Sequence, residues 1–321
     1  MSYTRRSMLG SLVAAGAAAQ PPRPPKQKTW KPKLGILARY SDKNLEFIKQ
    51  EGFAGVELTT NPKGDLDFAT AGDDKAEKVK ASQRRHGLDL AVIQSVQNHI
   101  APDPEARKRA IAAFSKTIEF AGKLGAPFVS TTSGTMPGRP LEEQAAEIAR
   151  VYTENYFPLC EKHKVRIVWE PWAGGPNVAT GPAGYEALFK ALRDSPLVGI
   201  QYDPSHLLWQ MMDPIQAMRD FIDKIYAVHL KDTEILWPVL RRVGINPVNN
   251  ARWWRFRLPG MGAVDWPAFF TVLMEKGFEG PMNIEHEDNF YGWPYAGDDF
   301  PEDYKTGFRV ALRFLRQFVP A

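Results

Sequence analysis

The chain has 321 residues, of which 44% are hydrophobic, and its 41 Lys and Arg residues against 37 Asp and Glu residues give a net charge of +4. The apolar content is ample for a buried core and excludes bulk disorder, while so small a charge gives no argument for nucleic acid as a partner. The single cysteine, Cys160, excludes an internal disulfide and a multi-cysteine zinc site.

The first 30 residues resemble an export signal followed by a linker. Thr4-Arg5-Arg6 precedes an alanine-rich stretch that ends at Ala19, and five prolines follow by Lys33. This pattern is typical of a twin-arginine signal and predicts a periplasmic protein, with a cytoplasmic protein as the alternative. The apolar stretch is too short to span a bilayer, so we expect no stable membrane insertion. We assign residues 1–30 to signal and linker, and residues 31–321 to one catalytic domain.

From Leu34 onward, short apolar runs alternate with segments of helical periodicity. The expected strands cover residues 34–38, 55–58, 88–93, 127–130, 165–169, 197–202, 227–232 and 282–285. The expected helices cover residues 44–51, 74–86, 104–124, 141–163, 185–193, 214–223, 266–276 and 300–319. Eight strand–helix pairs in this order predict the α/β class and a single-domain (β/α)8 TIM barrel, whose active site lies at the carboxyl ends of the strands.

Four of these strands end in an acid or a histidine, namely Glu170, Asp203, His229 and Glu285. Because the carboxyl ends of parallel strands meet at one mouth, we expect these side chains to lie together. Three carboxylates and one imidazole favour a single divalent ion, with Mn²⁺ preferred and Mg²⁺, Co²⁺ or Zn²⁺ as alternatives. Such an ion would polarise a carbonyl, and a carboxylate beside the substrate would move the proton on the adjacent carbon.

The motifs around these residues are Val-Trp-Glu170-Pro, Tyr-Asp203-Pro-Ser-His206, Val-His229-Leu-Lys-Asp and Ile-Glu285-His-Glu. They resemble the xylose-isomerase-like barrel family of sugar isomerases and epimerases, over roughly residues 33–321. The resemblance implies that Glu170, Asp203, His229 and Glu285 bind one metal ion. It also implies that Glu170 and Glu285 form the acid/base pair and that His206 contacts substrate oxygens.

One position departs from the epimerases of that family, which carry an arginine six residues after the ligand histidine. This chain has Ile235 there, and Lys231 or Arg257 is the expected substitute. Residues 233–264 are long for a βα loop, so we expect them to lie over the site, with Trp253 and Trp254 stacking on sugar or packing within the loop. His99 is expected either at the mouth or on a loop surface, and Glu57 either as a polar contact or as a salt-bridged rim residue.

These features predict a metal-dependent isomerase or epimerase that acts on an unphosphorylated sugar or glycoside. The predicted mouth lacks a glycine-rich phosphate cradle. The alternative is a lyase that uses the same proton abstraction to eliminate a β substituent from a keto-sugar or keto-glycoside. An apurinic-site endonuclease would need more than the six histidines present. A sugar-binding protein would have little need of two opposed carboxylates. We expect a small carbohydrate substrate and no nucleic acid, and we leave a homo-oligomer open.

Overall fold

The computed structural model describes residues 30–319, and one compact unit begins at Lys31. The predicted export signal lies outside the described residues and stays a prediction. Within residues 30–319, none of the helices combines the length and the apolar character needed to cross a membrane.

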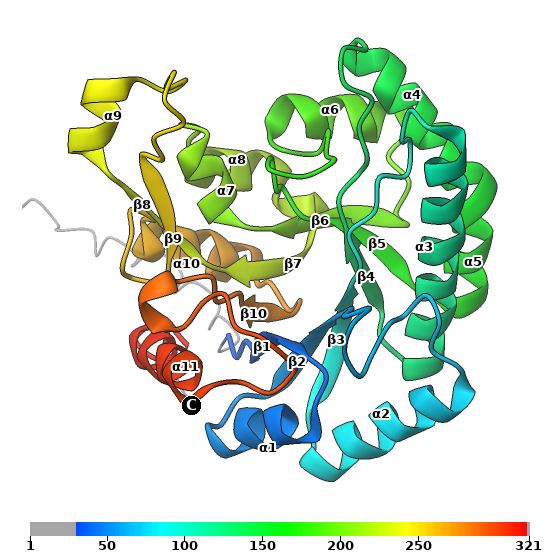
Figure 1. Ribbon diagram of the computed structural model, residues 1–321, viewed down its shortest axis with the longest axis horizontal. Helices are drawn as coiled ribbons and strands as arrows, with labels where there is room; N and C mark the ends of the chain where they lie inside the picture. Colours follow the sequence, from blue (N-terminus) through cyan, green and yellow to red (C-terminus); the bar gives the residue numbers. More distant parts are fainter. Residues whose placement is uncertain (1–29, 320–321) are drawn as a thin grey trace, which may run out of the picture. The chain divides into compact units, whose positions relative to one another are not determined.

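Eight parallel strands close into a barrel in the order β1-β10-β7-β6-β5-β4-β3-β2 (Figure 1), which confirms the predicted TIM barrel. Burial on both sides explains their apolar sequences, because the inner face fills the barrel and the outer face packs on helices. The barrel strands are β1 (Leu34–Arg39), β2 (Gly55–Thr59), β3 (Asp89–Gln94), β4 (Phe128–Thr131), β5 (Arg166–Trp169), β6 (Val198–Tyr202), β7 (Ile225–Leu230) and β10 (Met282–Ile284).

Helices surround the barrel, and the ends of some of them carry clear capping signals. The long helix α3 begins after Asp103, whose side chain accepts a hydrogen bond from the Ala106 amide, and ends at Gly125 with φ of 78°. The helices are α1 (Asp42–Gln50), α2 (Asp73–His86), α3 (Pro104–Leu124), α4 (Leu141–Val151), α5 (Phe157–His163), α6 (Pro182–Ala191), α7 (Pro204–Trp209), α8 (Pro214–Phe221), α9 (Trp237–Val243), α10 (Trp266–Lys276) and α11 (Glu302–Leu315). Short helical turns are η1 (Tyr152–Tyr156), η2 (Ile222–Lys224) and η3 (Asn289–Tyr291).

The helix expected over residues 141–163 is present but changes its winding in the middle. The segment η1 is a π-helical turn between α4 and α5. Pro158 lies in the first turn of α5 and has no backbone N–H to give to the preceding turn, which accounts for the local change.

The long segment after β7 forms a ribbon that the sequence did not predict. Its strands β8 (Asp232–Ile235) and β9 (Trp254–Arg257) pair antiparallel, with α9 between them. Buried Asp232 anchors it, since its carboxylate accepts hydrogen bonds from the Thr233, Gly260 and Val264 amides and from the Trp266 indole. Gly262 is required at this anchor, because a Cβ there would lie 2.3 Å from the Asp232 carboxylate.

Candidate active site

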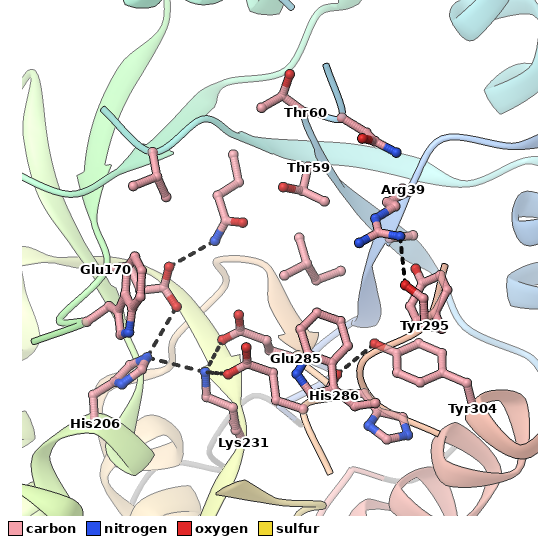
Figure 2. Close-up of a pocket in the computed structure, with 18 residues that line it drawn as sticks. Arg39, Thr59, Thr60, Glu170, His206, Lys231, Glu285, His286, Tyr295 and Tyr304 are labelled. Atoms are coloured by element: carbon pink, nitrogen blue, oxygen red, sulfur yellow. Dashed lines mark hydrogen bonds and ion pairs between the residues drawn. The ribbon is translucent and has the colours of Figure 1, made fainter. Parts of the chain in front are cut away.

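A cavity of about 280 Å³ opens at the carboxyl ends of the barrel strands (Figure 2). Glu170, His206, Lys231 and Glu285 line one side of it, and Arg39 and Thr59 line the opposite side. The remaining lining residues are Leu37, Ala38, Thr60, Asn61, Gln94, Val96, Trp172, His286, Glu287, Trp293, Tyr295 and Tyr304. A volume of this size suits a single sugar ring rather than an extended polymer.

Asp203 and His206 lie where β6 breaks into α7. Asp203 is the N-cap of this helix, and its Oδ1 accepts a hydrogen bond from the Ser205 amide at 2.8 Å. Its other oxygen, Oδ2, is buried and receives no hydrogen bond, although Lys231 Nζ lies 3.2 Å away and His206 Nε2 lies 3.5 Å away. One oxygen of this carboxylate thus caps the helix, and the other faces the buried cluster of Glu170, His206 and Glu285.

Glu170, at the end of β5, and Glu285, at the end of β10, converge on His229 from β7. His229 Nδ1 lies 3.3 Å from Glu170 Oε1 and 3.0 Å from Glu285 Oε2. Gln94 from β3 donates a hydrogen bond to Glu170 Oε2 at 2.9 Å and so fixes its rotamer. Four strands therefore supply the two acids and their nearest polar neighbours, as the strand-end pattern predicts.

Lys231 lies at the centre of the acids and is fully buried. Its Nζ is 2.5 Å from Glu285 Oε2, 2.9 Å from Glu287 Oε2 and 3.2 Å from Asp203 Oδ2. The phenyl ring of Phe256, from the β8–β9 ribbon, covers this ammonium group at 4.4 Å. Burial alone would lower the pKa of Lys231, but the surrounding carboxylates raise it well above its usual value, so the side chain stays charged.

A buried network beneath these residues holds His229 in place. Glu57, in the middle of β2, is fully buried, and its Oε2 lies 3.0 Å from His229 Nε2. Gln201 and Asn283 donate further hydrogen bonds to the same carboxylate, each at 2.8 Å to Oε2. Gln201 Nε2 also lies 2.6 Å from His229 Nε2. Glu57 is therefore an interior residue that contacts His229, and the rim position offered as one expectation is wrong.

The two acids have opposite proton affinities. Burial alone would raise the pKa of Glu170, but hydrogen bonds from His206 and His229 hold it well below its usual value. Burial and the charge of Glu170 raise the pKa of Glu285 to about 8, and the nearby Lys231 reduces this shift without cancelling it. Two carboxyl groups with pKa values driven apart are the arrangement that an acid/base pair needs.

The donor set at this site fits a divalent cation. One ligand atom from each of Glu170, Asp203, His206 and Glu285 lies within 4.8 Å of the others. This compact set contains His206, whereas the sequence predicts His229, which approaches two of the same acids through Nδ1. The buried Asp203 Oδ2, which has no hydrogen bond, and the concentration of carboxylates both suit a hard metal ion.

His99 lies neither at the mouth nor on a loop surface, so both expectations for it are wrong. It is fully buried, and its ring nitrogens lie 2.8 Å from the Tyr156 hydroxyl and 3.1 Å from the Thr131 hydroxyl. Phe114 packs edge-on against the ring at 4.7 Å. Burial lowers the pKa of His99 to about 3, so it is a neutral core residue and does not line the cavity.

Arg257, Trp253 and Trp254 also lie away from the cavity lining. Arg257 makes ion pairs with Glu234 of the ribbon at 2.6 Å and with Asp288 of the segment after β10 at 2.7 Å, and both partners hold its guanidinium away from the cavity lining. Trp253 is buried and donates a hydrogen bond to the Ile245 carbonyl.

Other side chains of the protein pack against the Trp254 ring. The Trp209 indole stacks on it at 4.7 Å and the Arg252 guanidinium lies 4.0 Å from its centroid. Two groups cannot share one ring face at these separations, so both faces are covered. The aromatic residues that line the cavity are Trp172, Trp293, Tyr295 and Tyr304, and the ribbon contributes Phe256, which packs edge-on against His206.

Comparison with known proteins gives a consistent picture of the chain. The family model described as xylose isomerase-like TIM barrel matches residues 45–318. The Bacillus subtilis protein YfiH, itself described as uncharacterised, is 29% identical over 280 residues, which span 76% of this chain and 87% of that protein. The inosose dehydratase of Geobacillus kaustophilus is 28% identical over 70% of this chain and 77% of its own length.

A solved structure with the same architecture is that of 3-keto-D-glucoside 4-epimerase from E. coli. It superposes with a TM-score of 0.63 over 89% of this chain and all of that chain, at 18% sequence identity. At this identity the likeness concerns the fold alone, and it agrees with the closed eight-stranded barrel. The family model covers most of the described barrel, and the chain therefore belongs to the xylose isomerase-like TIM barrel family.

Proposed function

We propose that this enzyme uses one divalent metal ion, held by Glu170, Asp203, His229 and Glu285, to move a proton on the carbon next to a sugar carbonyl. The observation that carries the proposal is the pair of buried acids, Glu170 and Glu285, which converge on His229 and line one cavity. The bound ion would polarise the carbonyl and so acidify the adjacent C–H bond. Mn²⁺ is the preferred ion for this oxygen-rich set.

Glu170 and Glu285 divide the proton transfers between them. Glu170, whose pKa is low, is ionised at neutral pH and accepts the proton from carbon. Glu285, whose pKa is raised by burial and by the charge of Glu170, has the higher proton affinity of the two and would deliver the proton. In an epimerase the proton returns to the opposite face of the same carbon, and in an isomerase it reaches the neighbouring carbon. In a lyase Glu285 protonates a β-hydroxyl group, which leaves as water while a C=C bond forms.

Hydrogen bonding favours His229 over His206 as the metal ligand. Glu57 accepts a hydrogen bond from the Nε2–H group of His229, so a neutral ring carries its free lone pair on Nδ1, which faces Glu170. Trp209 instead donates to Nδ1 of His206 at 3.4 Å, and the Lys231 ammonium group lies 3.2 Å from its Nε2, so donors face both ring nitrogens of His206. His206 lines the cavity and is therefore placed to contact a substrate oxygen rather than to bind the ion.

The substrate is an unphosphorylated sugar or glycoside, and isomerisation or epimerisation is our first assignment. The cavity of about 280 Å³ supports a substrate of one sugar ring, and the fold is shared with a 3-keto-D-glucoside 4-epimerase. Elimination is the second candidate, because the sequence relative named inosose dehydratase is more similar to this chain. Ile235 also stands where the epimerases would carry an arginine.

The test is proton exchange in D₂O with Mn²⁺-loaded protein and a panel of keto-sugars and keto-glycosides. We expect deuterium at the carbon next to the carbonyl, measured by NMR, and we expect EDTA to abolish it and Mn²⁺ to restore it. Mass spectrometry then separates the reactions, since a lyase product is lighter by one water and an isomer is not. Absence of metal-dependent exchange across the panel would refute the proposal.

A further inference from the structure

Two cationic side chains line the cavity, and they differ in whether a carboxylate lies within ion-pair distance. Lys231 is surrounded by three carboxylates, those of Asp203, Glu285 and Glu287. Arg39, at the end of β1, has no carboxylate within ion-pair distance among residues 30–319. Its hydrogen bonds within that range run from Nη1 to the carbonyl oxygens of Tyr295 and Gly297, which carry no charge. Carboxylates therefore neutralise the charge of Lys231, whereas Arg39 has no carboxylate partner among residues 30–319.

The Arg39 guanidinium is held in a fixed position on the cavity wall. The two carbonyl groups fix Nη1, and the Tyr295 ring packs against the guanidinium at 4.7 Å. The nearest acid along that loop, Asp298, is committed elsewhere, to the Asn61 side chain at 2.6 Å and the Asp65 amide at 2.7 Å. Nε and Nη2 thus keep donors for a ligand, because a guanidinium carries five N–H groups.

Thr59 completes the wall beside Arg39. The two residues are direct partners in the parallel pairing of β2 with β1, so their side chains leave the barrel at the same level. Figure 2 shows both of them across the cavity from Glu170, His206 and Lys231. A substrate ring that reaches the acids with its reacting carbon therefore presents its far end to Arg39 and Thr59.

We propose that Arg39 and Thr59 form a subsite for a carboxylate, so that the enzyme acts on a sugar acid whose carboxylate lies far from the reacting carbon. This rests on the proposed function. A planar guanidinium binds a planar carboxylate through two parallel hydrogen bonds, and a neighbouring hydroxyl adds a third donor. A partly buried guanidinium without a counter-charge gains most from an anionic ligand. One guanidinium and one hydroxyl match a singly charged carboxylate better than a phosphate, which needs more donors.

The experiment compares three matched sugars bound to the Mn²⁺-loaded protein by calorimetry. Glucuronate carries a carboxylate where glucose carries CH₂OH, and glucose 6-phosphate carries a phosphate group. We expect glucuronate to bind at least tenfold more tightly than glucose, about 1.4 kcal/mol. Arg39→Gln should remove this difference by weakening the binding of glucuronate more than that of glucose. Arg39→Lys should keep part of it.

Arg316→Gln is the matched control, because Arg316 also donates to a backbone carbonyl, that of Gly52, and is not part of the cavity lining. Equal binding of glucuronate and glucose to the unaltered protein would overturn the inference without any variant. Tighter binding of glucose 6-phosphate would overturn the choice of carboxylate. If Arg39→Gln lost affinity equally for both sugars, the inference would be wrong, and the role of Arg39 would be to hold the loop that contains Tyr295. Metal-dependent exchange on neutral keto-sugars would keep the proposed function in each of these cases.

Discussion

Two buried histidines, one in the segment after β3 and one within β7, have opposite chemistry. His99 and His229 are both fully buried, and both have partners at both ring nitrogens. The partners of His99 are hydroxyl groups within an aromatic cluster, and burial lowers its pKa to about 3. Burial acts on His229 in the same direction, but Glu57 and Glu285 raise its pKa well above the usual value. Complete burial is thus common to both, and the neighbouring side chains decide which one can serve a reaction.

The largest effect is expected from removing the proton-transfer groups beside His229. Glu170→Gln and Glu285→Gln keep the size of the side chains but cannot exchange protons, so each should lower kcat by about 10²- to 10⁴-fold. Metal content, measured by elemental analysis, should remain at least partial in both. If either variant retains near-normal turnover, the corresponding acid or base assignment is wrong.

The next effect distinguishes the two histidines that approach the acids. His229→Ala should weaken Mn²⁺ binding by about 100-fold or more, because it removes a direct ligand and leaves Glu57 without that partner. His206→Ala is the matched control and should raise KM while changing the Mn²⁺ affinity less than tenfold. Calorimetric titration of the metal-free variants measures both. The opposite ranking would identify His206 as the ligand, as the compact four-residue set suggests.

Glu57→Gln tests whether the residue below the site positions His229. An amide can no longer act as a strong acceptor for Nε2–H, so we expect about 10- to 100-fold weaker metal binding with a folded barrel. Substitution by cobalt adds a second readout, since a reoriented imidazole changes the visible absorption spectrum of bound Co²⁺. Glu57→Asp should recover part of the affinity if the carboxylate is what matters. An unchanged affinity and spectrum in Glu57→Gln would limit this residue to a role in stability.

The neutral state of His99 makes a prediction about stability against pH. Its folded pKa is about 3 and its unfolded value is near 6.5, so the unfolded chain binds more protons between these limits. Stability should therefore fall as the pH falls below 6.5. Between pH 6.5 and pH 5 the contribution of this group is about 1.5 kcal/mol. Urea titrations at both pH values should show His99→Gln losing less stability than the unaltered protein by about this amount, and parallel losses would contradict the assignment.

The sequence predicted those parts of the molecule that follow from local patterns. Strand ends can be located by apolar runs and breaks, and this was enough to predict that Glu170, Asp203 and Glu285 would meet. Glu57 was less clear, because its role depends on which strands lie across the barrel interior. Its signal was a charged residue within the apolar run Gly55-Val-Glu-Leu, which burial makes costly unless it has partners.

Loop residues were predicted less well than strand ends, for a physical reason. The path of a loop depends on tertiary contacts such as those of Asp232, which turns the segment after β7 into a ribbon. In that ribbon Trp254 stacks on Trp209, whereas Phe256 packs against His206 of the candidate active site. The residue types of Trp254 and Phe256 and their positions along the chain do not show which of the two would lie beside the site.

The smallest effect on activity is therefore expected from substitution of Trp254. This variant tests whether a ribbon residue contacts the substrate as the cavity-lining residues do. Trp209 and Arg252 cover the two faces of the Trp254 ring, so no face remains for a sugar. Trp254→Ala should change kcat/KM less than twofold, although it should lower the melting temperature because the stacked pair is lost. Trp172→Ala is the matched comparison, since this tryptophan lines the cavity, and it should raise KM about tenfold. Steady-state kinetics on one substrate measures both variants. A rise in KM for Trp254→Ala as large as that for Trp172→Ala would mean that the ribbon turns this ring toward the cavity when substrate binds, which would contradict the covering of both ring faces by Trp209 and Arg252.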